Sequence, residues 1–96
     1  MSNKNEKPLK VLIDKMLRAY GYGPKLDEIG LVKSWEGVVG KMIANHTTDI
    51  YFKDGDLHVK IDSAPLRQEL AFAKSKLIEK LNQEAGKRLV KNINFR

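Results

Sequence analysis

The side chains best able to carry a function in this chain are basic, and they are concentrated in its last third. Residues 74–96 hold seven lysines and arginines against two acids, which is +5 of the net charge of +6. Lysine and arginine bind nucleic acid by neutralising phosphates, so this concentration favours a polyanionic partner. A solvated basic helix without a partner is an equally weighted alternative. The candidate phosphate contacts are Lys74, Lys76, Lys87, Arg88 and Lys91.

One tyrosine offers a second kind of contact. Tyr51 is expected on the outer face of a sheet, near Lys53 and Lys60 and close to Lys91. An aromatic ring there could stack on a base while the lysines hold its backbone. An ordinary cross-strand aromatic is an equally weighted alternative.

Residues suited to catalysis or metal binding are scarce. The absence of cysteine excludes thiolate catalysis and cysteine-based zinc sites. His46 and His58 are the two histidines, and neither lies in a Glu-x-x-His pattern, so we expect no metal and no cofactor. His46 suits a helix C-terminus, and His58 is expected to pack on Tyr51. With no phosphate loop, serine elbow or acidic dyad, the sequence predicts a protein that is not an enzyme.

A short glycine motif needs a separate interpretation. Gly37-Val-Val-Gly40 matches the Gly-x-x-Gly loop with which KH domains clamp a nucleic-acid backbone. It lies inside an apolar helical stripe, and neither central residue is basic. Helix packing, with close approach of another backbone, is therefore favoured over a phosphate-contacting loop.

The elements that must position these residues are organised around a hairpin over residues 48–61. Asp54-Gly55 predicts a two-residue turn, which fixes the register all the way to Thr48 opposite Ile61. A slip by one residue would put charge into the apolar face. That face is formed by Ile50, Phe52, Leu57, Val59 and Ile61, while the other face carries the charge pairs Lys53–Asp56 and Asp49–Lys60. Helices must cover the apolar face, because an isolated hairpin is marginal in water.

Two helical segments precede the hairpin. After a flexible polar arm at residues 1–7, the apolar spacing predicts a helix that begins at Pro8 and ends at the turn over residues 21–24. A second stripe runs from about Leu26 to His46. It is either one kinked helix or two short helices that meet near residues 30–34.

One helix and one strand follow the hairpin. Ser63 can cap a helix of about 22 residues that ends at Gly86, and residues 88–95 form a last strand. Phe72 projects away from the apolar stripe of this helix. Either the first helix covers it, which is the favoured interpretation, or it is an exposed aromatic available to a partner. The expected core anchors are Trp35, Phe52, Leu57, Val59, Leu70 and Leu77.

The resulting fold class is α+β, in the order helix, helix, strand, strand, helix, strand. A helical crossover to a parallel last strand gives a three-stranded sheet with the helices on one face. The 96 residues, 42% of them hydrophobic, suffice for one domain over residues 8–96. Without an apolar run of about 18 residues or a signal-peptide core, we expect a cytoplasmic protein with no membrane partner.

A series of short motifs in this order resembles the DciA family over about residues 9–96. The motifs are Trp35-Glu-Gly-Val-Val-Gly40, Ile43-Ala-Asn-His46-Thr47, Gly55-x-Leu57-x-Val59, Ser63-Ala-Pro-Leu-Arg-Gln-Glu-Leu70, Leu81-Asn82 and Ile93-Asn-Phe95. The resemblance implies a KH-like domain in bacteria that recruits or loads the replicative DNA helicase and binds DNA. Two departures are Leu66, where tryptophan is frequent, and the absence after Arg96 of a long basic extension.

These observations favour a non-enzymatic module that binds nucleic acid, DNA rather than RNA, and that acts with the replicative helicase. Without the extension, autonomous helicase loading is not expected. The alternative is a protein–protein adaptor whose basic surface only solvates the domain. Salt dependence separates the two, because phosphate contacts weaken steeply as salt is added.

Overall fold

The predicted order of helices and strands is present in the structure, a computed structural model that describes the backbone of residues 2–96 and the side chains from residue 8 onwards. Two of the predicted helices are each divided into two, and the last strand begins at Asn92 and not at the predicted residue 88, because residues 88–91 belong to the loop held by Asn82. The elements are α1 (Ser2–Ala19), α2 (Gly23–Val39), α3 (Lys41–Asn45), β1 (Thr47–Lys53), β2 (Asp56–Ile61), α4 (Ala64–Phe72), α5 (Lys74–Ala85) and β3 (Asn92–Phe95).

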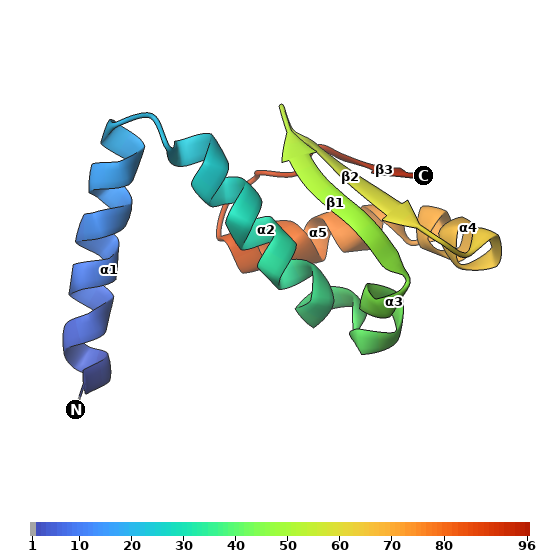
Figure 1. The fold of residues 1–96 in the computed structure, drawn as a ribbon, viewed down its shortest axis with the longest axis horizontal. Coiled ribbons are helices and arrows are strands. Elements are labelled where there is room, and N and C mark those ends of the chain that lie inside the picture. The colour runs from blue at the N-terminus through green and yellow to red at the C-terminus, as the bar shows by residue number, and fades with distance from the viewer. Residues whose placement is uncertain (1) are drawn as a thin grey trace.

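The sheet has the predicted topology, with β2 between an antiparallel β1 and a parallel β3 (Figure 1). Tyr51 lies opposite His58, as the turn and the alternation required. The register differs at the start of β1, where a bulge between Thr47 and Asp49 places Thr47, not Thr48, opposite Ile61. A bulge inserts one extra residue into a strand, which local alternation does not reveal.

The hairpin turn has the backbone that its sequence demands. Asp54 has a φ of 53° and Gly55 a φ of 87°, the two positive values of a type I′ turn. A Cβ on Gly55 would lie 3.0 Å from Cδ of Lys91. The Lys91 N–H donates a hydrogen bond to the Gly55 carbonyl at 2.8 Å, so the turn also anchors the segment before β3.

Replacing Gly55 with valine is expected to cost roughly 1 to 3 kcal/mol of stability, because a β-branched residue resists a positive φ. The midpoint of urea unfolding measures this loss. Gly30→Ala is the control, since Gly30 lies within α2 with open space around it. An unchanged midpoint for Gly55→Val would place the turn elsewhere.

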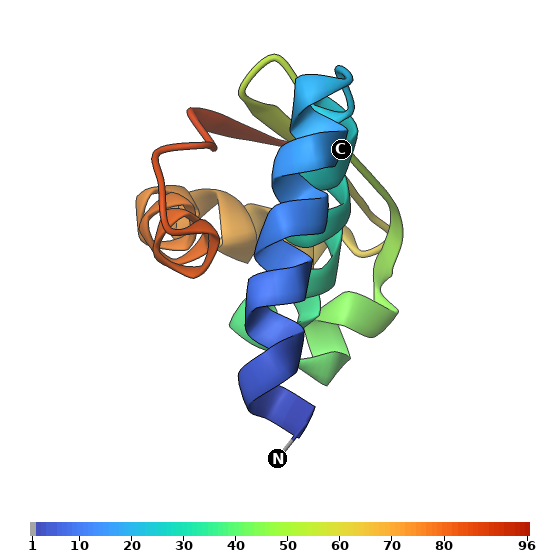
Figure 2. The same ribbon diagram turned by 90° about the vertical axis from the view of Figure 1, so that its left-hand side faces the viewer.

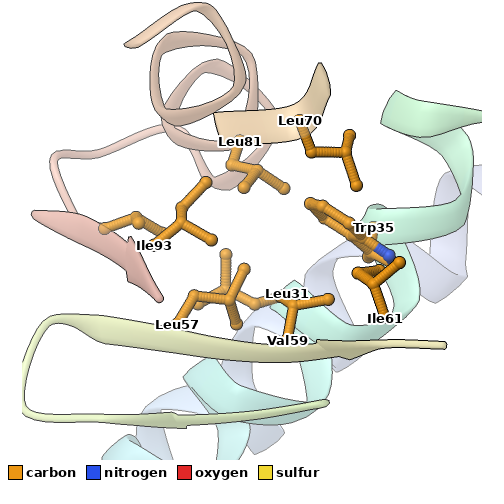
Figure 3. Close-up of a cluster of buried hydrophobic side chains, with 9 residues drawn as sticks. Leu31, Trp35, Leu57, Val59, Ile61, Leu70, Leu81 and Ile93 are labelled. Atoms are coloured by element: carbon orange, nitrogen blue, oxygen red, sulfur yellow. The ribbon is translucent and has the colours of Figure 1, made fainter. Parts of the chain in front are cut away.

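The core lies between one face of the sheet and helices α2, α4 and α5 (Figure 3). Trp35 of α2, Leu70 of α4 and Leu81 of α5 are buried against Leu57 and Val59 of β2. Two further expected anchors, Phe52 and Leu77, are partly buried around this cluster. The helices therefore cover one face of the sheet and leave the other open.

Helix α1 projects away from this core (Figures 1 and 2). It begins at Ser2 and not at the predicted Pro8, which lies inside it; a proline removes one helical hydrogen bond without always ending the helix. Most of the predicted arm at residues 1–7 therefore has helical backbone, and Met1 lies outside the described residues. The apolar residues Leu9, Val11, Leu12, Ile13, Met16 and Tyr20 are exposed.

The prediction that α1 covers Phe72 is wrong. Phe72 is 80% exposed at the end of α4. Helix α1 packs near the start of α2, whereas α4 lies at the opposite end of the molecule (Figure 1). Apolar spacing identified the face of α1 but carried no information on where that face points.

The second stripe breaks at Gly40, not near residues 30–34. Helix α2 runs through Gly30, and Gly40 has a φ of 91°, which separates α2 from α3. The expected close packing at the glycine motif is also wrong, because a Cβ on Gly37 or Gly40 would meet nothing within 4 Å. Gly40 is instead needed for its left-handed backbone.

Two smaller features complete the fold. His46 caps α3, as predicted, and its Nδ1 lies 2.7 Å from Oδ1 of Asp62. Ala73 separates α4 from α5, so the predicted long helix is bent there. Within residues 2–96, no helix has the length and apolar character needed to cross a membrane.

Candidate nucleic-acid interface

The open face of the sheet carries the residues that alternate with the core. The strand register places Tyr51, His58 and Asn94 in one row across all three strands. Lys53 lies beside this row toward the hairpin turn, and Lys60 lies beside it on the other side. We call this surface the outer sheet face; it consists of Asp49, Tyr51, Lys53, Asp56, His58, Lys60, Asn92, Asn94 and Arg96.

An aromatic stack lies at the centre of the outer sheet face. The rings of Tyr51 and His58 are parallel within 14°, with centroids 4.5 Å apart, which confirms the predicted packing. The guanidinium carbon of Arg96 is 5.7 Å from the Tyr51 ring centroid, within cation–π range. Asn94 places its amide 3.4 Å from His58 Nδ1. The stack is therefore formed by β1 and β2 and held by β3 and the residue after it.

Arg96 and Asn94 were not identified as site residues from sequence, although a signal was present. Ile93 and Phe95 are apolar residues two apart in the last strand, and both pack on its inner face. Since side chains alternate along a strand, Asn94 and Arg96 had to lie on the outer face beside Tyr51. The decisive step was the pairing of β3 with β2, which brings these residues to the stack.

The lysines on the outer sheet face are exposed. Lys53 pairs in register with Asp56, and Lys60 with Asp49, as the alternation predicted. In the described part of the chain neither lysine forms an ion pair. Both ammonium groups are therefore available to an anionic ligand.

A second basic group lies on the loop between α5 and β3. Asn82 of α5 holds this loop: its Oδ1 accepts from the Leu89 N–H at 3.0 Å and from the Val90 N–H at 2.8 Å, and its Nδ2 donates to the Val90 carbonyl at 3.1 Å. Arg88 and Lys91 are exposed and line a groove of about 820 Å³ beside α5. Because Lys91 packs on Gly55, this loop meets the hairpin end of the sheet.

Lys87, a predicted phosphate contact, has a partner inside the protein. Its Nζ lies 3.3 Å from Oδ1 of Asp27, and the same oxygen accepts a hydrogen bond from Arg18 at 2.9 Å. Burial raises the pKa of Asp27, but the hydrogen bonds from Arg18 and Lys87 outweigh it and leave the pKa below its ordinary value. Lys87 therefore ties the loop to α2, and charge counting could not show this because the two residues are distant in sequence.

The remaining predicted bases are separate from both groups. Lys74 is half-buried and Lys76 exposed at the start of α5, beside the exposed ring of Phe72. Neither lines the groove beside the loop. The glycine motif also contributes nothing to the interface, because its central residues Val38 and Val39 pack against the core.

The sequence of this domain matches a known protein family. A family model described as "Dna[CI] antecedent, DciA" matches residues 8–95. The chain belongs to the DciA family. This confirms the resemblance seen in its motifs.

Two relatives that match this chain are longer than it is. A UPF0232 protein of Rhodococcus jostii is 26% identical over 93 residues, which cover 97% of this chain and 50% of that protein. A UPF0232 protein of Mycolicibacterium paratuberculosis is 26% identical over 92 residues, or 96% of this chain and 51% of that protein. The chain thus spans about half the length of these relatives. No solved structure matches it, so the KH-like assignment stays a prediction.

Proposed function

We propose that this DciA-family domain is a non-enzymatic cytoplasmic module that binds single-stranded DNA and acts beside the replicative helicase. The observation that carries the proposal is the Tyr51–His58 stack with Arg96 beside it, on the sheet face opposite the one that packs on the core of residues 2–96. Base–aromatic stacking contributes about 1 to 3 kcal/mol per base and tolerates any sequence. Paired bases hide their faces in the duplex, so this surface favours unpaired strands.

The basic residues fit the path of a strand that crosses the stack. Lys60 and Lys53 flank the stack on either side along the sheet. Beyond Lys53, the hairpin turn contacts Lys91, and Arg88 lies on the same loop. A backbone that follows this line meets cations while its bases face Tyr51. Lys87 is not included, because it already pairs with Asp27.

The test is fluorescence anisotropy with a labelled oligothymidine of about 20 nucleotides, longer than the roughly 4 to 16 that a single OB-fold covers. Tyr51→Ala is expected to weaken binding about 5- to 150-fold, whereas Tyr51→Phe retains the stack and the affinity. Tyr20→Ala is the matched control, since Tyr20 is a tyrosine next to α1 that is 77% exposed. Equal losses of DNA affinity for Tyr20→Ala and Tyr51→Ala would mean that the Tyr51–His58 stack does not contact the DNA.

Salt titration tests the basic loop separately. Arg88→Gln with Lys91→Gln is expected to flatten the slope of log affinity against log salt by up to about 0.7 for each phosphate that is no longer neutralised. Lys10→Gln with Lys15→Gln on α1 is the control for net charge. If the wild-type domain binds no DNA even at about 50 mM salt, where phosphate contacts are strongest, the adaptor function takes precedence.

Helicase docking is the part of the proposal that rests on the family alone. Family membership supports it, and no surface of the domain is yet assigned to it. Co-sedimentation of the domain with the purified replicative helicase of the same bacterium, with and without single-stranded DNA, is the direct measurement. Co-sedimentation without DNA is expected; co-sedimentation only through DNA would reject direct docking.

A further inference from the structure

The free edge of β1 has backbone groups that point away from the sheet. β1 is an edge strand, and the Phe52 N–H points outward, where Glu28 Oε2 accepts its hydrogen bond at 3.1 Å. In an antiparallel pair, the N–H and C=O of every second residue point to the same side. Ile50 therefore presents both backbone groups to this edge, and the strand offers a ladder to a further strand.

A groove runs along the same edge, between β1 and α2. It has a volume of about 420 Å³ and is lined by Lys25, Glu28, Ile29, Val32, Lys33 and Ile50. Ile29 is 42% and Val32 is 37% exposed, so its floor is apolar and open. The adjacent side of α2 holds the buried Leu31 and Trp35. The groove is therefore a surface of α2 that the core does not use.

We infer that the β1 edge and this groove bind an extended acidic peptide segment by strand addition. The segment's backbone pairs with Ile50, and alternate apolar side chains lie on Ile29 and Val32, which is how peptides add to a sheet edge beside a helix. This site is distinct from the outer sheet face, and the inference does not rest on DNA binding.

The charges around the groove decide the occupant. Lys25 and Lys33 flank the apolar floor, and within the described residues Lys33 forms no ion pair. A second copy of this chain would bring the same lysines together across a two-fold interface, where they repel. An acidic segment neutralises them instead, so the partner is a different protein whose alternating apolar residues are flanked at both ends by acidic ones.

Glu28 occupies the position that an incoming carbonyl would take. The Phe52 N–H, and then the Lys25 ammonium, hold its pKa below the ordinary range, so it is ionised at neutral pH. It thereby blocks nonspecific strand pairing at this edge, as charged side chains on edge strands do. The bound segment displaces Glu28 from Phe52 in order to extend its ladder.

The probe is a synthetic peptide of about eight residues, roughly a strand in length, with a core that alternates valine and threonine and a glutamate at each end. Binding is measured by the chemical shift of the Ile50 amide. Saturable binding that is abolished when the valines are N-methylated is expected, because N-methylation removes the ladder but keeps the side chains. No binding at about 1 mM peptide would overturn the inference.

Surface variants locate the site. Ile29→Lys and Val32→Lys are each expected to weaken binding at least about 10-fold, since a charge replaces an apolar contact. Val11→Lys on α1, where Val11 is 52% exposed, is the matched control and leaves affinity unchanged. Equal losses for all three lysine variants would mean that the peptide binds elsewhere or nonspecifically.

Variants of Glu28 distinguish the displacement of its side chain from a general effect of its charge. Glu28→Ala frees the Phe52 N–H and is expected to tighten binding roughly 2- to 10-fold. Glu28→Gln removes the charge but keeps an acceptor for Phe52, so it tightens binding less. Equal effects would overturn the displacement step. If Glu28→Ala makes the protein dimerise in sedimentation and abolishes peptide binding, the occupant is a second copy.

Discussion

Replacing Trp35 with alanine is expected to lower the free energy of unfolding by about 3 to 5 kcal/mol. The side chain is 2% exposed, its ring centroid lies 6.3 Å from that of Phe95, and its indole N–H donates to Thr47 Oγ1 at 3.1 Å. Small domains have only about 5 to 15 kcal/mol of total stability. Urea unfolding followed by circular dichroism should therefore show a largely unfolded protein at low denaturant.

Two milder variants separate the contributions of Trp35. Trp35→Phe keeps a ring in the core and is expected to lose less stability than the alanine variant. Thr47→Val removes the acceptor of the indole N–H together with the hydroxyl donor to the Ile43 carbonyl, and it is expected to cost about 1 to 3 kcal/mol. A folded Trp35→Ala protein with an unchanged midpoint would mean that Trp35 is not the anchor of this core.

Replacing Asn82 with leucine is expected to cost about 2 to 4 kcal/mol, since each buried polar group left unpaired costs about 1 to 3. The Val90 N–H loses its acceptor and the Val90 carbonyl loses a donor, while the Leu89 N–H keeps only the Lys87 carbonyl at 2.9 Å. Thermal unfolding measures the loss. The loop that carries Arg88 would also lose its attachment to α5, so DNA affinity should fall although no cation is removed.

Asn82→Asp is the control for this prediction. Its carboxylate still accepts from both N–H groups, and only the donor to the Val90 carbonyl is removed, so the variant should retain more stability than the leucine variant. If aspartate and leucine destabilise equally, the side-chain oxygen does not hold the loop.

The hairpin and its outer face could be predicted because their determinants are local. Asp54-Gly55 fixes the turn, and alternation then fixes which residues share a face with Tyr51. The break at Gly40 was missed because the apolar spacing continues through it, and spacing does not report the sign of φ. The bulge near Thr48 was missed because local alternation does not reveal an extra residue in a strand.

What the sequence did not reveal depends on contacts between distant segments. Counting charges identified Lys87, but only the fold shows that Asp27 already binds it. The position of Arg96 beside Tyr51 required the pairing of β3 with β2. The groove of Ile29 and Val32 required α2 to lie along β1. The charge or apolar character of these residues was evident from the sequence, whereas the residues that they contact were not.

Helix α1 has a consequence for local unfolding. It is tied to the rest through the Arg18–Asp27 pair and the turn at Gly21, and none of its side chains from residue 8 onwards belongs to the core cluster. Opening α1 therefore leaves the core intact, whereas the amides of Leu57 and Val59 are released only when the whole domain unfolds. Hydrogen exchange should be fast in α1 and slow in β2, and a protease should cleave α1 first.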